Sequence, residues 1–197
     1  MTTRTQVVAL AAGLTLAVAS LSGCQWLAGQ TSPSFPPAKT TPNPTPPETA
    51  QEREMRADQE AAMKAYTTAT KEADRLAMAG GATKPTKTLL ATTGGFYLDV
   101  QMDGLKNFKE NGWRTDRLPT NAVVADGGWS PDNLGLTACE DTSKVRILDK
   151  KGKEVLKDRD MRYVQTLTAT RKNGVWKITD VESKAVKTFE HEGNCAP

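Results

Sequence analysis

RYVQTLTATRKNGVWKITDVESKAVKTF, residues 162–189, is the stretch of sequence that decides the fold. Two runs of alternating apolar and polar residues flank Asn173-Gly174, a dipeptide typical of the two-residue type I′ turn of a β-hairpin. Such a turn sets the register of the two strands. The predicted cross-strand pairs are Lys172 with Val175, Arg171 with Trp176, and Ala169 with Ile178.

This register sorts the hairpin into two faces. Arg171 is expected to lie over the ring of Trp176. Because one face is apolar and the other is polar, we predict that the hairpin ends an antiparallel sheet with one buried side. The apolar face carries Leu167, Ala169, Trp176 and Ile178. The polar face carries Thr166, Thr168, Thr170, Lys177 and Thr179.

A long helix is predicted well before the hairpin. Thr49 and Glu52 have the spacing of a capping box, no proline or glycine follows up to Ala79, and Gly80-Gly81 provides a stop. A narrow apolar stripe recurs at helical spacing and consists of Met55, Ala62, Tyr66, Ala69, Ala73 and Leu76. The opposite face carries Arg53, Glu54, Lys64, Lys71 and Arg75, which we interpret as a solvated surface.

The residues between the long helix and the hairpin predict a shorter helix and more strands. Leu98, Met102, Leu105 and Phe108 follow helical spacing up to Asn111-Gly112, although Gly104 interrupts the run. A helical turn is possible over residues 88–92. Short strands are predicted over 122–125, 134–139 and 145–148. The expected fold class is therefore α+β, with the long helix and the shorter helix packed on a curved antiparallel sheet.

The N-terminus carries an export signal. Leu21-Ser22-Gly23-Cys24 follows an uncharged run from Val7 to Ala19, with Arg4 ahead of it. The run is too short to span a membrane, which takes about 20 apolar residues, and it fits a secretory signal. The four residues resemble the lipobox of bacterial lipoproteins. That resemblance implies cleavage after Gly23 and a diacylglyceryl thioether on Cys24, with acyl chains such as palmitate. The alternative is an ordinary cleaved signal that leaves Cys24 as a plain thiol.

The predicted organisation has three parts: a signal peptide over residues 1–23, a lipidated cysteine with a spacer over 24–47, and one α+β domain over 48–197. Seven of the eleven prolines lie between Thr31 and Ala50, which favours extended polyproline II and excludes a core. An anchor at Cys24 would hold the domain on the extracytoplasmic side of the cell membrane. The formal charge is +3 from 26 cations and 23 anions, and +2 without Arg4, too little to indicate nucleic acid.

Lipidation of Cys24 leaves two cysteines, Cys139 and Cys195. An even remainder outside the cytoplasm predicts one disulfide, worth about 4 kcal/mol in the chain-entropy model. The alternatives are weaker. A metal site needs more ligands than two cysteines and His191 supply, and a catalytic thiol would want a basic partner from a chain with one histidine. We therefore predict no metal site and no cofactor.

Further along the chain, short motifs resemble a known superfamily. They are Leu136–Lys144, Asp149–Lys153, Gly174–Ile178 and the late Cys195. In this layout the domain resembles the nuclear-transport-factor-2-like roll, and more closely the actinobacterial and actinophage lipoproteins that carry one. The resemblance implies the roll fold. It does not imply one function, because members include dehydratases, isomerases, polyketide cyclases and non-catalytic binding modules.

The sequence offers few candidates for chemistry. His191 lies near the terminus, so we interpret it as a solvated residue and not as a base. A metal site of Glu190, His191 and Glu192 is not expected, because adjacent residues do not share a face of a strand. Asp99 and Asp126 could line a cavity, although charged residues near glycines are usually surface. Trp113 and Trp129 each lie beside a glycine, and either fill the core or form an aromatic rim on a ligand cavity or partner surface. No residue is predicted to be catalytic.

Three functional hypotheses follow. The first is a lipid-anchored, exported, non-enzymatic module that binds an envelope protein or a small ligand. The second is a prophage-encoded lipoprotein for superinfection exclusion, which unchanged phage sensitivity of a deletion lysogen would refute. The third is a cyclase or isomerase, which predicts an enclosed cavity with at least two buried ionisable groups. A cavity lined only by apolar and threonine side chains would remove this third hypothesis.

Overall fold

The computed structural model describes residues 47–190 and 192–195. The predicted signal peptide, Cys24, the spacer up to residue 46, and His191 lie outside the described residues. The first described helix, α1 (Ala50–Met78), begins at the predicted capping box. The hydroxyl of Thr49 accepts a hydrogen bond from the backbone N–H of Glu52, and the Glu52 carboxylate accepts one from the backbone N–H of Thr49.

The end of α1 is set by its glycines. Gly80 and Gly81 both have positive φ angles, which only glycine adopts without strain. A Cβ on Gly81 would collide with the backbone of Leu105 and Lys109, so this glycine also lets the following chain approach the next long helix. The predicted stop is confirmed, and the chain after the glycine pair lies against Leu105.

Two further helices follow: α2 (Lys87–Thr92) and α3 (Gly95–Asn111). The predicted helical spacing in α3 is confirmed, with Met102 and Leu105 buried and Leu98 and Phe108 partly buried. Gly104 is accommodated in the interior of α3, where a Cβ would meet nothing within 4 Å. The helix ends at Gly112 in the left-handed conformation.

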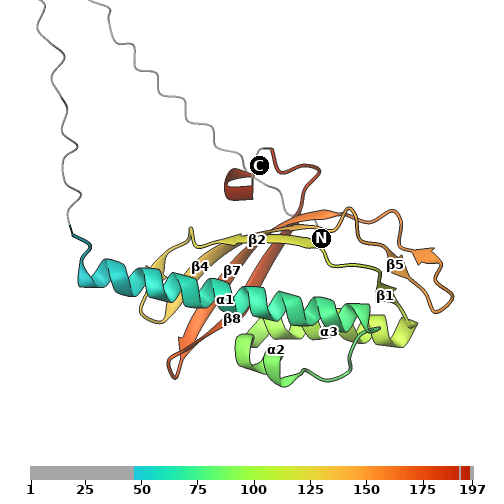
Figure 1. Ribbon diagram of the computed structural model, residues 1–197, viewed down its shortest axis with the longest axis horizontal. Helices are drawn as coiled ribbons and strands as arrows, with labels where there is room; N and C mark the ends of the chain where they lie inside the picture. Colours follow the sequence, from blue (N-terminus) through green and yellow to red (C-terminus); the bar gives the residue numbers. More distant parts are fainter. Residues whose placement is uncertain (1–46, 191, 196–197) are drawn as a thin grey trace, which may run out of the picture. The chain divides into compact units, whose positions relative to one another are not determined.

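The strands form two antiparallel sheets. The main sheet has the order β2–β4–β7–β8, with β3 paired beside β4, and comprises β2 (Thr120–Val124), β3 (Trp129–Ser130), β4 (Asn133–Asp141), β7 (Arg162–Lys172) and β8 (Val175–Ala185). The small sheet has the order β1–β5–β6 and comprises β1 (Arg114–Thr115), β5 (Ile147–Leu148) and β6 (Glu154–Val155). Figure 1 shows the small sheet near the C-terminal end of α1.

The predicted hairpin register is confirmed in β7 and β8. All three predicted pairs occur, and Asn173 and Gly174 both have positive φ angles, as a type I′ turn requires. The guanidinium carbon of Arg171 lies 5.6 Å from the centroid of the Trp176 ring. A β-bulge beyond Ala169 is an addition to the prediction: Ala169 pairs with Ile178 and Thr168 with Asp180, which leaves Thr179 as the extra residue.

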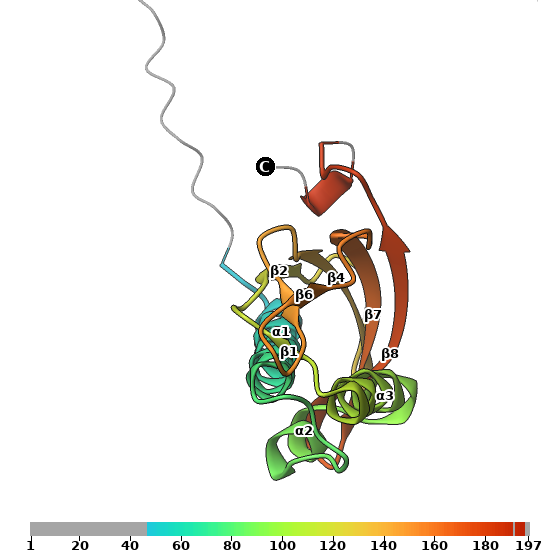
Figure 2. The ribbon, with the colours of Figure 1, turned by 90° about the vertical axis from the view of Figure 1, so that its right-hand side faces the viewer.

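The helices cover one face of the curved main sheet (Figure 2). The core joins the stripe of α1 to the apolar face of the strands, including Tyr66, Ala69, Leu136, Leu167 and Ile178. A second cluster joins the end of α1 to α2 and α3 and contains Ala73, Leu76, Leu89, Met102 and Leu105. The predicted α+β class, with helices packed on a curved antiparallel sheet, is confirmed.

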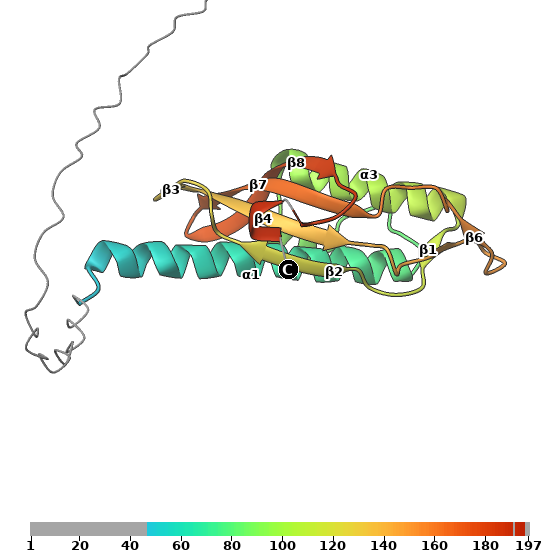
Figure 3. The same ribbon diagram turned by 90° about the horizontal axis from the view of Figure 1, so that it is seen from above.

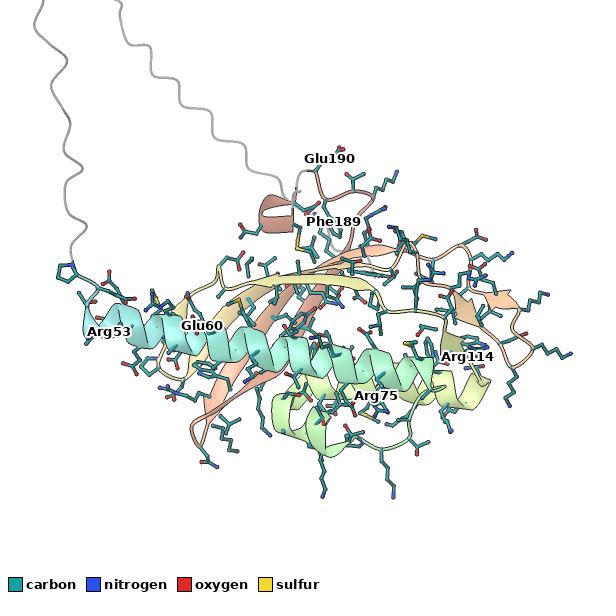
Figure 4. All side chains as sticks on the ribbon, viewed as in Figure 1. Arg53, Glu60, Arg75, Arg114, Phe189 and Glu190 are labelled. Carbon is teal, nitrogen blue, oxygen red and sulfur yellow. A yellow bond between two sulfur atoms is a disulfide. The ribbon has the colours of Figure 1, made fainter. Side chains whose placement is uncertain are left out.

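The other face of the sheet carries the C-terminal segment, which ends in the 3₁₀ helix η1 (Gly193–Cys195). Figure 3 shows η1 over β4, and Figure 4 labels Phe189 and Glu190 on the chain leading to it. The structure joins Cys139 to Cys195, with a Cα–Cα distance of 5.6 Å, which is the predicted pair. The disulfide therefore ties the end of the described chain to the outer face of the central strand β4.

Candidate ligand pocket

The helix-facing side of the sheet changes character along its strands. In β4 the inward residues Leu134, Leu136 and Ala138 are buried and apolar, and the next inward residue is Glu140. The antiparallel register places Asn121 of β2 and Tyr163 of β7 on either side of Glu140. The sheet therefore presents an apolar centre and one polar end, and the polar end faces the C-terminal half of α1.

A pocket of about 230 Å³ lies at this polar end. Asp74 of α1, Phe108 of α3, Glu140 of β4 and Tyr163 of β7 meet there. The remaining lining residues are Thr115, Pro119, Thr142, Val145, Ile147 and Arg159. We call this site the Asp74–Glu140 pocket. It combines two carboxyl groups from different elements with aromatic and aliphatic walls.

Both carboxyl groups of the pocket bind protons more tightly than usual. Burial, and after it the nearby charge of Glu140, raises the pKa of Asp74 to about 7. Burial also raises the pKa of Glu140, against the opposing effect of the Arg159 charge. Asp74 therefore changes its ionisation near neutral pH, which is the range in which a side chain can accept or release a proton in function.

The two carboxyl groups differ in their hydrogen bonds. Nε2 of Gln165 donates to Oε2 of Glu140 at 3.1 Å, and Oε1 of Gln165 accepts from the hydroxyl of Tyr66 at 3.4 Å. Among the described residues, no hydrogen bond or ion pair holds the Asp74 carboxylate. Asp74 is thus the unpartnered acid of the pocket, and Glu140 is the anchored one.

Two buried tyrosines lie behind the pocket. Tyr66 and Tyr97 are each only 1% exposed. Burial raises the pKa of both phenols, and the charges of Glu140 and Asp74 raise it further. Both phenols therefore remain protonated across the physiological range and can serve as hydrogen-bond donors.

Arg159 forms part of the wall, and both terminal nitrogens of its guanidinium group are engaged in hydrogen bonds. One guanidinium nitrogen donates to the hydroxyl of Thr142 at 2.7 Å, and the other donates to the carbonyl of Val145 at 2.5 Å. These bonds hold the chain segment between β4 and β5. Among the described residues, Arg159 forms no ion pair with either pocket acid.

The opposite end of α1 carries a very different acid, Asp58, which is 6% exposed. Its carboxylate accepts hydrogen bonds from the indole N–H groups of Trp129 at 3.2 Å and Trp176 at 3.0 Å. Arg171 donates a third bond at 3.0 Å. We call these four residues the Asp58 clamp. It ties the start of α1 to β3, β7 and β8.

Both acids, Asp58 and Asp74, have a signal in the sequence that the predictions above do not include. Asp58 lies four residues before Ala62, and Asp74 follows Ala73, so both fall on or beside the apolar stripe of α1. An acid within an apolar stripe is a buried acid that needs a donor. The exposed face of α1, by contrast, is as predicted: Arg53, Glu54, Lys64, Lys71 and Arg75 are all exposed, and Figure 4 labels Arg53 and Arg75.

The four residues proposed from sequence for a cavity or ligand do not line this pocket. Trp129 belongs to the Asp58 clamp, and Trp113 packs edge-to-face on Phe108 with 6.2 Å between ring centroids. Asp99 is exposed on α3. Asp126 is exposed as well and accepts a hydrogen bond from Asn194 at 2.5 Å. The structure therefore separates these residues and brings others together.

A larger pocket, of about 340 Å³, lies beside the disulfide on the outer face of the sheet. Its acid, Asp141, is already held by Arg162 at 3.1 Å and by the backbone N–H of Ser143 at 2.7 Å. A satisfied, partly exposed ion pair is ordinary surface chemistry. For this reason we place the candidate site at the smaller pocket, whose acid Asp74 is unpartnered.

Within residues 47–190 and 192–195, no group of three or more His, Cys, Asp or Glu side chains is arranged to hold a metal ion. None of the helices in that same part of the chain combines the length and apolar character that a membrane crossing requires.

Comparison with known proteins yields structural likenesses only. No family model and no curated protein matches the chain. The intermembrane-space region of the chloroplast protein ARC6 is similar over 66% of this chain and 98% of its own, with 16% identity and a TM-score of 0.46. Kfla4162 from Kribbella flavida is similar over 66% and 91%, with 11% identity and a TM-score of 0.41. A protein with a cystatin-like fold from Caulobacter vibrioides is similar over 72% of this chain and 96% of its own, with 14% identity and a TM-score of 0.33.

Proposed function

We propose that this chain is a lipid-anchored, extracytoplasmic protein whose domain binds a small molecule in the Asp74–Glu140 pocket. The observation that carries the proposal is the unpartnered, half-buried carboxylate of Asp74 in a pocket with a second half-buried acid. A buried acid without a donor destabilises the fold, and such groups concentrate at functional sites. A bound molecule that supplies the missing partner offsets that cost.

Binding can be tested without knowing the natural ligand. A library of small cationic, neutral and anionic fragments is added to the purified chain, and backbone amide and methyl NMR shifts are followed. We expect hits to perturb Val145 and Ile147, which line the pocket. Asp74→Asn should alter the binding of those hits. Asp99→Asn, the same change at an exposed acid, is the matched control, and hits that leave the pocket signals unmoved would count against the site.

The lipid anchor rests on the lipobox resemblance at Cys24, which lies outside the described residues. Its test is Cys24→Ala in the producing cell. We expect the variant to be released from membranes and to take up no acyl label. A variant that still fractionates with membranes would contradict lipidation.

A proton-transfer enzyme, of the cyclase or isomerase type, is a second candidate. One observation favours it: Asp74 titrates near neutral pH beside a second acid and two protonated phenols, which suits general acid–base chemistry. Incubation with small ketones in D₂O should then exchange the protons next to the carbonyl, and Asp74→Asn should abolish the exchange. Binding without proton exchange would exclude the enzyme and leave the ligand-binding module as the remaining candidate.

A further inference from the structure

Several hydrogen-bond acceptors at the Asp74–Glu140 pocket have few or no donors among the described residues. Asp74 receives no hydrogen bond from the described residues, and Glu140 receives one, from Gln165. Asn121 is the cross-strand neighbour of Glu140, and its Oδ1 is buried without a donor. A polar atom in this state costs free energy until a donor reaches it. These acceptors therefore have room for further donors, and the charged lining residues are two acids against one cation, Arg159.

The protein's own cation does not meet this need. The guanidinium of Arg159 is engaged with Thr142 and the carbonyl of Val145, as described above. A bound ligand can supply the missing donors in place of solvent water. An ammonium group carries three donors, no acceptor and a positive charge, which is the complement of this acceptor set.

The side chains that line the pocket indicate what the uncharged part of the ligand is. Phe108 and Tyr163 supply aromatic rings, whose faces attract cations, and Pro119, Val145 and Ile147 supply apolar surface. A volume of about 230 Å³ admits a molecule smaller than a typical drug. The lining therefore fits a short apolar or aromatic body attached to the charged group.

We infer that the ligand of the Asp74–Glu140 pocket is a small organic amine, with its ammonium group between Asp74 and Glu140 and its apolar body against Phe108, Val145 and Ile147. This inference rests on the proposed function and names the class of molecule. No covalent step is involved.

Such a ligand couples binding to protonation. The ammonium group favours the ionised form of Asp74, so binding near neutral pH expels a proton from the pocket. Affinity should rise through pH 7 and fall only when the amine itself loses its proton, at about pH 10. The titratable or charged groups that face Asp74 are Glu140 on β4, Tyr97 on α3, Tyr66 on α1, and Tyr163 and Arg159 in the pocket wall.

The test is calorimetric titration of the full-length chain with 2-phenylethylamine, against a detergent blank. Its neutral isostere, 2-phenylethanol, has the same body without the charge. We expect the amine to bind about tenfold more tightly at pH 8 than at pH 6, because the ionised fraction of an acid of pKa about 7 changes by that factor. Buffers of different ionisation enthalpy should reveal proton release at pH 7. The alcohol should bind at least tenfold more weakly and without pH dependence.

Variants locate the effect. Asp74→Asn should weaken amine binding at least tenfold and remove its pH dependence, and Glu140→Gln should weaken it as well. Asp99→Asn should bind like the parent chain. Because Asp74→Asn removes a buried charge, we expect it to fold, and NMR spectra of the variants check this directly.

The outcomes separate the inference from the proposed function. Equal binding of amine and alcohol in the pocket, or unchanged amine binding by Asp74→Asn, would refute the amine while leaving a ligand pocket. Pocket binding of the anionic probe 3-phenylpropionate in place of the amine would do the same. Absence of pocket shifts with all three probes would refute the amine, and a fragment library that also moves no pocket signal would refute the proposed function.

Discussion

The two ends of α1 each carry an aspartate that faces the domain, and the surroundings of these two aspartates differ. Asp58 and Asp74 are sixteen residues apart, or about 24 Å along the helix, and both face the inside of the domain. Asp58 receives three donors from the sheet, whereas Asp74 receives none from the described residues and faces a second acid. The carboxylate of Asp58 is thus satisfied by hydrogen bonds within the domain, and that of Asp74 is not.

The difference lies in what the strands present to the helix. Near Asp58, the strands contribute indole N–H groups and a guanidinium. Near Asp74, they contribute the carboxyl group of Glu140 and the amide of Asn121, whose Oδ1 receives no hydrogen bond from the described residues. A buried carboxylate is stabilising or costly according to its donors. The clamp therefore stabilises the fold, whereas the unpartnered carboxyl group of Asp74 destabilises it.

Breaking the clamp should have the largest effect. Asp58→Asn leaves the Arg171 charge without its closest partner and turns an amide N–H₂ toward indole donors, since an amide offers only one acceptor oxygen. We expect a loss of about 3 kcal/mol in the free energy of unfolding, because an uncompensated charge and unpaired donors remain inside. Urea unfolding followed by tryptophan fluorescence measures it. A loss below about 1 kcal/mol would show that the clamp does not hold α1.

Asp74→Asn, the same substitution at the other end of α1, should raise the free energy of unfolding. The folded-state pKa of Asp74 is about 7, above its unfolded value of about 4, so the wild type loses stability as pH rises from 4 to 7. Asp74→Asn avoids that loss. Its stability advantage should be absent below pH 4 and reach about 2 kcal/mol above pH 7, a figure reduced to allow for partial exposure. Urea unfolding at pH 4, 6 and 8 measures it, and a destabilised variant at pH 8 would contradict the comparison.

Removing a single donor from the clamp should have a smaller effect. Trp129→Phe deletes one of the three hydrogen bonds to Asp58 while keeping most of the ring, and we expect a loss of about 1 kcal/mol. Trp113→Phe is the matched control, because Trp113 contacts Phe108 and takes no part in the clamp. Equal losses in both variants would assign the effect to packing.

The smallest expected effect is a change in titration. Glu140→Gln removes the charge that helps to raise the pKa of Asp74, so the midpoint of Asp74 should move down while burial keeps it above the ordinary value. Carbon-13 NMR of the aspartate carboxyls follows this midpoint. An unchanged midpoint would mean that burial alone sets it and that the two acids are not coupled.

Much of the fold was predictable, and particular residues show why. Asn173-Gly174 fixed the hairpin register up to Ala169, and Thr49 with Glu52 fixed the start of α1, since both signals depend on neighbours within a few residues. The bulge at Thr179 was not predictable, because no local signal marks it. Single elements and their faces therefore follow from short-range pattern.

The candidate site was not predictable in the same way. Asp99 and Asp126 drew attention because aromatic residues or glycines lie next to them, yet both are exposed. Asp74 and Glu140 lie 66 residues apart with no motif between them, and the donors of Asp58 lie 71 to 118 residues away. Contacts at such separations have no signature within a sequence window. The position of Asp58 and Asp74 on or beside the apolar stripe of α1 is the one local sign of these contacts.

By itself, the sequence determined the turn, the caps, the buried faces and the pairing of Cys139 with Cys195, and it indicated an anchor at Cys24 that the described residues do not include. Only the tertiary structure decided which acids have partners. The reason is physical: a cap or turn is stabilised by atoms adjacent in the chain, whereas the ionisation of Asp74 depends on burial and on a charge brought in by a distant strand.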